Sequence, residues 1–256
     1  MAGHSKWANI KHRKGRVDAS RAKLFTKLSR EIIVAAKEGG PDTSQNPRLR
    51  MAVQKAKDGN MPNDRINRNI EKATGKGKDA EQIFESQYEG YGPDGTGFII
   101  NTLTENKNRT ISALRSTFTK SGGNLAESGA VSWQFEEKGL ILLDTNNTDQ
   151  ENLALDAIDL GAEDVNISES TLEVISSISQ LENLKINLEQ KGYAINSFEI
   201  AMIPKSSILL DHQKSVKILK LLDVLNDLDD VQKVFTNADF EESALNEYAE
   251  SISWYE

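Results

Sequence analysis

The 256-residue chain is long enough for two or three domains of ~100 residues each, and 38% of its residues are hydrophobic, which suffices for ordinary cores. It contains no cysteine, which excludes disulfides, thiol catalysis and cysteine-ligated zinc. No segment approaches the ~18 consecutive apolar residues of a membrane span, and the first residues lack the apolar stretch of a secretory signal. We therefore expect a cytoplasmic protein that does not associate with membranes.

The formal net charge of −8 conceals a strong asymmetry along the chain. Residues 1–78 carry 19 Lys and Arg against 7 Asp and Glu, a charge of +12, whereas residues 79–256 carry 12 against 32, a charge of −20. A basic end joined to an acidic remainder indicates a polyanion-binding unit attached to domains that repel the same polyanion.

Residues 1–19 hold several cations, one acid and few apolar side chains, so we expect a flexible basic tail. Trp7 could stack on a nucleic-acid base or fold back onto the neighbouring helices, and the sequence leaves both possibilities open. The candidate nucleic-acid-binding residues of this tail are Lys6, Trp7, Lys11, His12, Arg13, Lys14 and Arg16.

The next segment, residues 20–78, has the apolar spacing of short amphipathic helices with brief connections, which predicts a three-helix basic domain. Asn46 followed by Pro47 is a typical helix start, and Asn63 is the expected cap of the third helix. The apolar stripe of the first helix is expected to include Leu24. The predicted helices cover residues 20–37, 47–57 and 64–74.

Cations lie opposite the apolar stripes of the first and third helices. The second and third helices resemble a helix-turn-helix, in which Arg65, Arg68 and Asn69 would reach base edges. The alternative is a basic face that neutralises phosphates without strong sequence preference. The candidate binding residues of the helical domain are Lys23, Lys27, Arg30, Arg65, Arg68, Asn69 and Lys72.

Residues 138–204 follow the order βαββαβ, which is the ferredoxin-like arrangement. Its two helices are each expected to begin with a capping box, formed by Thr148 with Glu151 and by Ser179 with Glu182. The expected strands are 139–144, 164–168, 171–177 and 196–204, and the expected helices are 148–160 and 179–191.

The flanking segments 79–137 and 205–238 give the same order when joined, so we expect a discontinuous α/β domain that carries the other as an insertion. Residues 239–256 form an acidic C-terminal extension, expected to be disordered or a short docked helix. The predicted fold class is α+β: an N-terminal three-helix bundle plus two ferredoxin-like α/β domains, one inserted in the other. The strands expected in the discontinuous domain are 96–104, 128–137, 206–211 and 231–237, with helices at 108–121 and 212–226.

Nothing in the sequence predicts catalysis. The stretch Gly90–Gly95 matches G-x-G-x-x-G, but a strand follows it where a dinucleotide site needs a helix, so a hairpin turn is the better interpretation. The three histidines are dispersed and lack metal-ligand spacing. Asp227, Asp229 and Asp230 are interpreted as a solvated turn. We expect no enzymatic activity, no catalytic residues, no cofactor and no metal.

Three segments carry a resemblance to a known family: MAGHSKWANIKHRKGRVDASRAKLFTKLSREI, YEGYGPDGTGFI and NKNRTISALRSTFTKSGGNLAESGAVSWQFEEKG. They resemble the YebC/PmpR family from residue 1 to about residue 237. The resemblance implies a cytosolic protein with one basic helical domain and two acidic α/β domains. It also implies a role linked to nucleic acid, since the family is usually described as DNA-binding transcriptional regulators, and some members look like translation factors, including the mitochondrial translational activator of cytochrome oxidase.

Two functions are consistent with these observations. The first is a non-catalytic regulator that binds DNA and controls transcription. The second is a ribosome-associated translation factor that binds rRNA or tRNA and relieves stalling at consecutive prolines, as the resemblance implies for bacterial members. Dispersed cations and the lack of a clear dimerisation element favour the second, because helix-turn-helix repressors usually dimerise. The usual description of the family favours the first. In either case we expect a monomer, and the acidic domains could contact basic ribosomal proteins.

Overall fold

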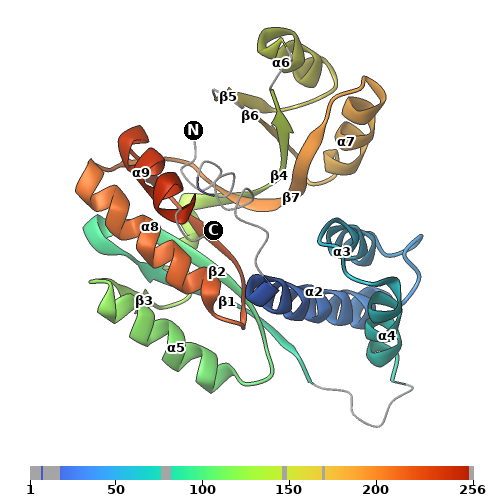
Figure 1. Cartoon of the computed structure of the whole chain (residues 1–256), viewed down its shortest axis with the longest axis horizontal. Coiled ribbons are helices and arrows are strands. Elements are labelled where there is room, and N and C mark those ends of the chain that lie inside the picture. The colour runs from blue at the N-terminus through green and yellow to red at the C-terminus, as the bar shows by residue number, and fades with distance from the viewer. Residues whose placement is uncertain (1–6, 8–17, 76–81, 146–148, 169–170, 254–256) are drawn as a thin grey trace.

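The computed structural model describes residue 7 and residues 18–75, 82–145, 149–168 and 171–253. It shows an α+β protein in which a helical bundle sits beside two sheet-containing domains (Figure 1). This confirms the predicted fold class.

The bundle consists of three helices packed around an apolar core. Asn46 caps the second helix, since its Oδ1 accepts a hydrogen bond from the Leu49 amide at 3.0 Å, and Pro47 occupies the first helical position as expected. The third helix begins at Asn63 itself, with Pro62 in the cap position and no side-chain cap bond, so the predicted Asn63 cap is wrong. Leu24 is 43% exposed rather than part of the core. The helices are α2 (Asp18–Gly39), α3 (Pro47–Asp58) and α4 (Asn63–Ala73).

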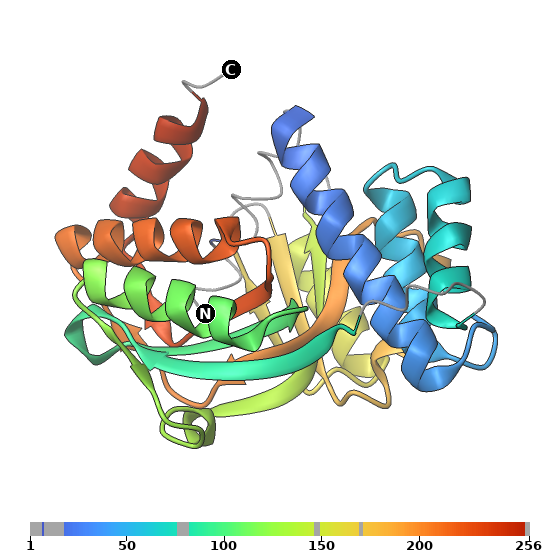
Figure 2. The ribbon, with the colours of Figure 1, turned by 90° about the horizontal axis from the view of Figure 1, so that it is seen from below.

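The middle domain has a four-stranded antiparallel sheet in the order β3-β1-β2-β9. Two helices cover one face of this sheet, as Figure 2 shows, and their apolar side chains meet those of β2 in one core around Phe98, Phe118 and Leu222. Its elements are β1 (Phe84–Tyr91), β2 (Gly97–Thr104), α5 (Lys107–Lys120), β3 (Asn124–Ala126), α8 (His212–Asp227) and β9 (Val231–Thr236).

Two strands of this domain differ from the prediction. The expected strand 128–137 is replaced by the short β3 at 124–126, a single helical turn at 132–134 and the start of a long strand at Phe135. The expected strand 206–211 does not join this sheet. In a ferredoxin-like sheet it would lie between β3 and β2, but that position is occupied by β1, a strand that the sequence analysis did not predict. The prediction missed β1 because this strand contains few apolar residues and begins with alternating half-buried and exposed side chains.

The inserted domain follows the predicted βαββαβ order and forms a sheet with strand order β5-β6-β4-β7. Neither predicted capping box forms among the described residues. Asp149 caps α6 by accepting from the Glu151 and Asn152 amides, while Thr148 lies outside the described residues, and α7 begins without a side-chain cap at Gln180. The elements are β4 (Phe135–Asp144), α6 (Gln150–Asp159), β5 (Asp164–Ile167), β6 (Thr171–Ser176), α7 (Leu181–Gln190) and β7 (Ile195–Pro204).

An apolar cluster joins the two sheet domains. Ile99 and Phe235 of the middle sheet pack with Leu142 and Ala201 of the inserted sheet, and all four are almost fully buried. Lys233 also donates a hydrogen bond to the Ile200 carbonyl at 2.8 Å. The two domains therefore share part of their cores.

The acidic C-terminal segment forms a docked helix, α9 (Glu242–Ser253), beside α8 (Figure 1). A two-stranded parallel pair, β8 (Ile208–Leu209) and β10 (Ala238–Asp239), precedes the two helices. His212 contacts Ser243 at 2.9 Å and Glu247 at 2.8 Å, and the Tyr248 hydroxyl donates to Asp223. Of the two alternatives for this segment, the docked helix is the observed one.

The hairpin turn that the sequence predicted at Gly90–Gly95 is present, but it begins at Gly92, because Gly90 and Tyr91 still belong to β1. It joins β1 to β2, which pair antiparallel from Tyr91 opposite Gly97 onward. Asp94 and Gly95 both have positive φ, at 59° and 78°, as this connection requires.

Candidate nucleic-acid interface

The cations of α2 are used in docking the bundle onto the middle domain. Lys23 and Lys27 donate to the carbonyls of Asp227 and Asn226, at 3.3 Å and 2.6 Å. These carbonyls lie in the last turn of α8, which carries the negative end of the helix dipole. Two of the predicted phosphate ligands therefore already have acceptors inside the protein.

Arg30 continues this contact. Its Nη1 donates to the Asp229 carbonyl at 2.7 Å and lies 3.2 Å from the Asp230 carboxylate. Asp230 is only 7% exposed and also receives bonds from Arg109 and Thr110. The predicted solvated turn is therefore wrong for Asp230, because its carboxylate is buried and satisfied by two guanidinium groups and a hydroxyl.

Helix α3 is held between the two sheet domains by ion pairs. Arg48 makes two bonds of 2.9 Å to Glu85 just inside β1, and Arg50 makes two bonds of 2.8 Å to Glu182 of α7. The Arg50 guanidinium lowers the pKa of the Glu182 carboxyl through these hydrogen bonds. Lys55 pairs with Glu199 of β7 at 3.4 Å. These cations are charge-neutralised within the chain.

Helix α4 carries three cations that lack acidic partners among the described residues. Arg65 lies over the Phe25 ring at 5.3 Å, a cation–π contact, while Arg68 and Lys72 are exposed and make no ion pair within the described part of the chain. Helix α4 therefore presents a group of neighbouring cations that remain accessible from outside.

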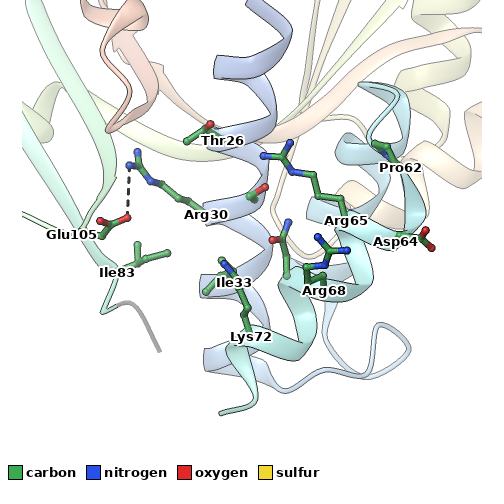
Figure 3. A pocket seen from close by; sticks show the side chains of 12 residues that line it. Thr26, Arg30, Ile33, Pro62, Asp64, Arg65, Arg68, Lys72, Ile83 and Glu105 are labelled. Atoms are coloured by element: carbon green, nitrogen blue, oxygen red, sulfur yellow. Dashed lines mark ion pairs between the residues drawn. The ribbon is translucent and has the colours of Figure 1, made fainter. Parts of the chain in front are cut away.

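These side chains border a pocket of about 520 Å³ between α2, α4 and the ends of β1 and β2 (Figure 3). Asn69 lines the pocket but is only 6% exposed, and its Nδ2 has no acceptor among the described residues. The buried Ser29 Oγ is likewise without a partner there. Figure 3 shows Arg30 reaching from α2 toward Glu105, with 3.9 Å between the two charged groups.

The predicted site residues thus fall into separate groups. The pocket brings together Arg30, Arg65, Arg68, Asn69 and Lys72, whereas Lys23 and Lys27 bind the end of α8. The predicted tail residues Lys6, Lys11, His12, Arg13, Lys14 and Arg16 lie outside the described residues.

Trp7 occupies neither of its two predicted positions. It is 3% exposed and belongs to the core of the middle domain, together with Leu245 and Tyr248 of α9. The indole is therefore covered in this structure and not available to stack on a base, because the largest apolar side chain of the tail is buried more favourably in a core.

The sequence analysis did not identify the acidic residues that bind some of the cations of the bundle. Glu85, Glu182 and Asp230 accept the guanidinium groups of the bundle, yet they lie in other domains and far along the chain. No local pattern could have identified these pairs. Within the described ranges, no cluster of His, Asp and Glu could hold a metal ion, and no helix is long and apolar enough to cross a membrane.

The molecule is an α+β protein in which a basic helical domain is fixed by ion pairs onto two sheet-containing domains. The family model described as the TACO1/YebC N-terminal domain matches residues 5–76, and the one described as the TACO1/YebC second and third domain matches residues 83–238. The chain belongs to the TACO1/YebC family, as the sequence resemblance indicated.

Relatives and a solved structure agree with this membership. A probable transcriptional regulatory protein of Dehalococcoides mccartyi is 52% identical over 97% of this chain and 98% of its own length. One from Natranaerobius thermophilus is 48% identical over 96% of this chain and 99% of its own. The crystal structure of a conserved hypothetical protein from Aquifex aeolicus superposes with a TM-score of 0.81 at 44% identity, covering 89% of this chain and 93% of that one.

Proposed function

We propose that the protein is a non-catalytic, cytoplasmic regulator of gene expression that binds nucleic acid through α4 and the pocket beside it. The observation that supports this is the sorting of cations. Six cations of α2 and α3 bind intrachain acceptors, whereas Arg68 and Lys72, neighbours on α4, are exposed without an acidic partner in the described structure. Unpaired cations on one helix attract phosphates and release counterions on binding. The names of the relatives, probable transcriptional regulatory proteins, point to the same class.

Paired charge substitutions test where binding occurs. Replacing Arg68 and Lys72 by alanine should weaken binding to duplex DNA and to structured RNA. It should also flatten the log–log salt dependence by about 2 units, because each cation removed leaves roughly one phosphate without its protein partner. The matched control is the double replacement of Lys37 and Lys57, which removes the same charge from exposed positions outside the pocket. Equal weakening by both double variants would move the interface away from α4.

A second candidate is the ribosome-associated translation factor, acting on rRNA or tRNA. Two observations favour it over a helix-turn-helix that reads a DNA groove. Asn69 is almost fully buried rather than presented to base edges, and α3 is enclosed between two domains by its pairs with Glu85 and Glu182. A protein that recognises RNA by its phosphates and shape can bind with Asn69 buried and α3 enclosed. In this role a monomer would direct its acidic domains toward basic ribosomal proteins.

Fractionation of a cell lysate on a sucrose gradient separates the two candidates. A ribosome factor migrates with ribosomes at low salt and leaves them at high salt, since the contacts are electrostatic. A transcriptional regulator remains with DNA or in the free fractions, and selects one DNA site over scrambled sequence. Translation of a message with consecutive prolines, with and without the protein, provides the functional readout.

A further inference from the structure

The pocket between α2 and α4 contains polar groups that phosphate binding at the surface does not use. Asn69 is 6% exposed, and its Nδ2 has no acceptor in the described structure. The buried Ser29 Oγ has no hydrogen-bond partner there either. Buried polar groups in folded proteins are almost always hydrogen-bonded, to protein, to water or to a ligand. Two unpartnered groups from facing helices, lining one pocket, therefore suggest a ligand with hydrogen-bonding atoms of its own.

The shape of the pocket indicates the size of that ligand. Its volume of about 520 Å³ lies in the range of small-molecule sites, ~300–1,000 Å³, and is far larger than one phosphate group requires. Part of the wall is apolar, formed by Ile33 of α2, Ile83 before β1 and Pro62 before α4. A flat apolar surface with hydrogen-bonding edges, such as a nucleobase, suits this combination.

The charges around the pocket indicate where a phosphate would lie. Arg65, Arg68 and Lys72 project from α4 at one side, and Arg30 stands on α2 opposite (Figure 3). Guanidinium groups match phosphate oxygens in geometry as well as charge. Arg30 is already paired with Asp230, so the three α4 cations, set against Asp64 and Glu105 in the pocket lining, leave a formal excess of one positive charge. This balance suits one phosphate better than a triphosphate.

We propose that the pocket binds a single nucleoside phosphate, with its phosphate at the Arg65–Arg68–Lys72 side and its base inside, against Ile33 and Ile83 and within reach of Asn69. The inference rests on the proposed nucleic-acid function, and it specifies the form of the ligand: an unpaired nucleotide that leaves its stack, or a free mononucleotide. A fully paired duplex would reach only the exposed cations, because its bases remain stacked.

The test uses the full chain and three probes: a fully paired RNA duplex, the same duplex with one bulged adenosine, and AMP as competitor. We expect the bulged duplex to bind about tenfold more tightly, which corresponds to one or two net hydrogen bonds plus apolar contact. Excess AMP should remove this preference while leaving binding to the paired duplex intact. Direct titration with AMP then shows whether a free mononucleotide suffices or the surrounding polymer is needed.

Variants locate the preference. Asn69→Leu keeps a similar side-chain volume at the buried position and removes the amide, so it should reduce binding of the bulged duplex to the level of the paired one. Lys57→Ala, which removes an exposed cation outside the pocket, should leave the preference for the bulged duplex unchanged. If Asn69→Leu fails to fold, competition by AMP on the unaltered protein still shows whether the preference for the bulged duplex depends on a nucleotide site.

The possible results separate this inference from the proposed function. Equal affinity for the paired and bulged duplexes overturns the pocket inference and leaves nucleic-acid binding standing. Binding of neither duplex nor AMP overturns both. Saturable AMP binding that Asn69→Leu abolishes, without binding to either duplex, supports the pocket and overturns the proposed function.

Discussion

Arg30 of α2 and Asp230, the residue before β9, are 200 residues apart in sequence, yet the guanidinium Nη1 lies 3.2 Å from the carboxylate Oδ1. Their side chains are 13% and 10% exposed, so the pair is largely shielded from water. Arg109 binds the same carboxylate from α5. This acid is therefore one of the groups that fix the bundle to the middle domain, beside the α8 carbonyls and Glu85.

Replacing Asp230 by asparagine should destabilise the protein by about 3 kcal/mol, because removal of one partner leaves the shielded Arg30 charge uncompensated. This value is at the lower end of the ~3–5 kcal/mol that breaking a buried ion pair costs. The Arg109 side chain is 56% exposed, so water can solvate its charge when the carboxylate is removed. Urea unfolding, followed by circular dichroism, measures the change. The matched control is Asp229→Asn, whose carboxylate is exposed and which should cost within ~0.5 kcal/mol; equal effects would contradict the role of the pair.

The coupling between Arg50 and Glu182 should be small and sensitive to salt. The two side chains are 38% and 49% exposed, so a double-mutant cycle with alanine should give about 0.5–1 kcal/mol at low ionic strength and less at high. The pKa of Glu182 is lowered mainly by its bonds to Arg50, so the contribution is present above the ordinary glutamate pKa and disappears as the pH falls through the lowered one. A coupling unchanged at acidic pH would exclude this pair as its source.

Tyr248 should make stability fall more steeply at alkaline pH. Burial and the hydrogen bond to Asp223 raise its pKa, so the folded protein retains a proton that the unfolded chain loses above pH ~10. The contribution is complete below that pH and declines as the pH rises toward the raised pKa, by up to ~1.4 kcal/mol per pH unit. Unfolding of Tyr248→Phe, compared with the unaltered chain at several alkaline pH values, should lack this component. Parallel curves for the two proteins would contradict the assignment.

The isolated segment 1–78 should bind nucleic acid with a steeper salt dependence than the full chain. Cutting it from the other domains frees the α2 and α3 cations from the α8 carbonyls and from Glu85 and Glu182. If three more cations reach phosphates, the log–log slope should steepen by about 2.7 units. Circular dichroism of the segment first establishes that it is helical. Identical slopes for the segment and the full chain would mean that docking does not occupy these cations, and measurable binding by residues 79–256 would contradict the charge argument itself.

Local patterns determined much of this protein. The three helices of the bundle, the Asn46–Pro47 helix start, the hairpin at Gly90–Gly95 and the βαββαβ order of the inserted domain all follow from spacing and turn residues acting over a few positions. The charge asymmetry likewise identified the basic end of the chain. Such features are readable because their causes lie within one or two turns of helix or one strand.

Only the tertiary structure decided which of these residues are free to bind anything. It placed β1 in the sheet where a later segment was expected, buried Trp7 in the middle domain, and withdrew Asn69 into a pocket. It also paired Arg30 and Arg48 with acids from another domain, leaving Arg68 exposed without one in the described structure. The physical reason is that burial and ion pairing depend on which distant segments meet, and identical side chains on one amphipathic face differ only through those neighbours.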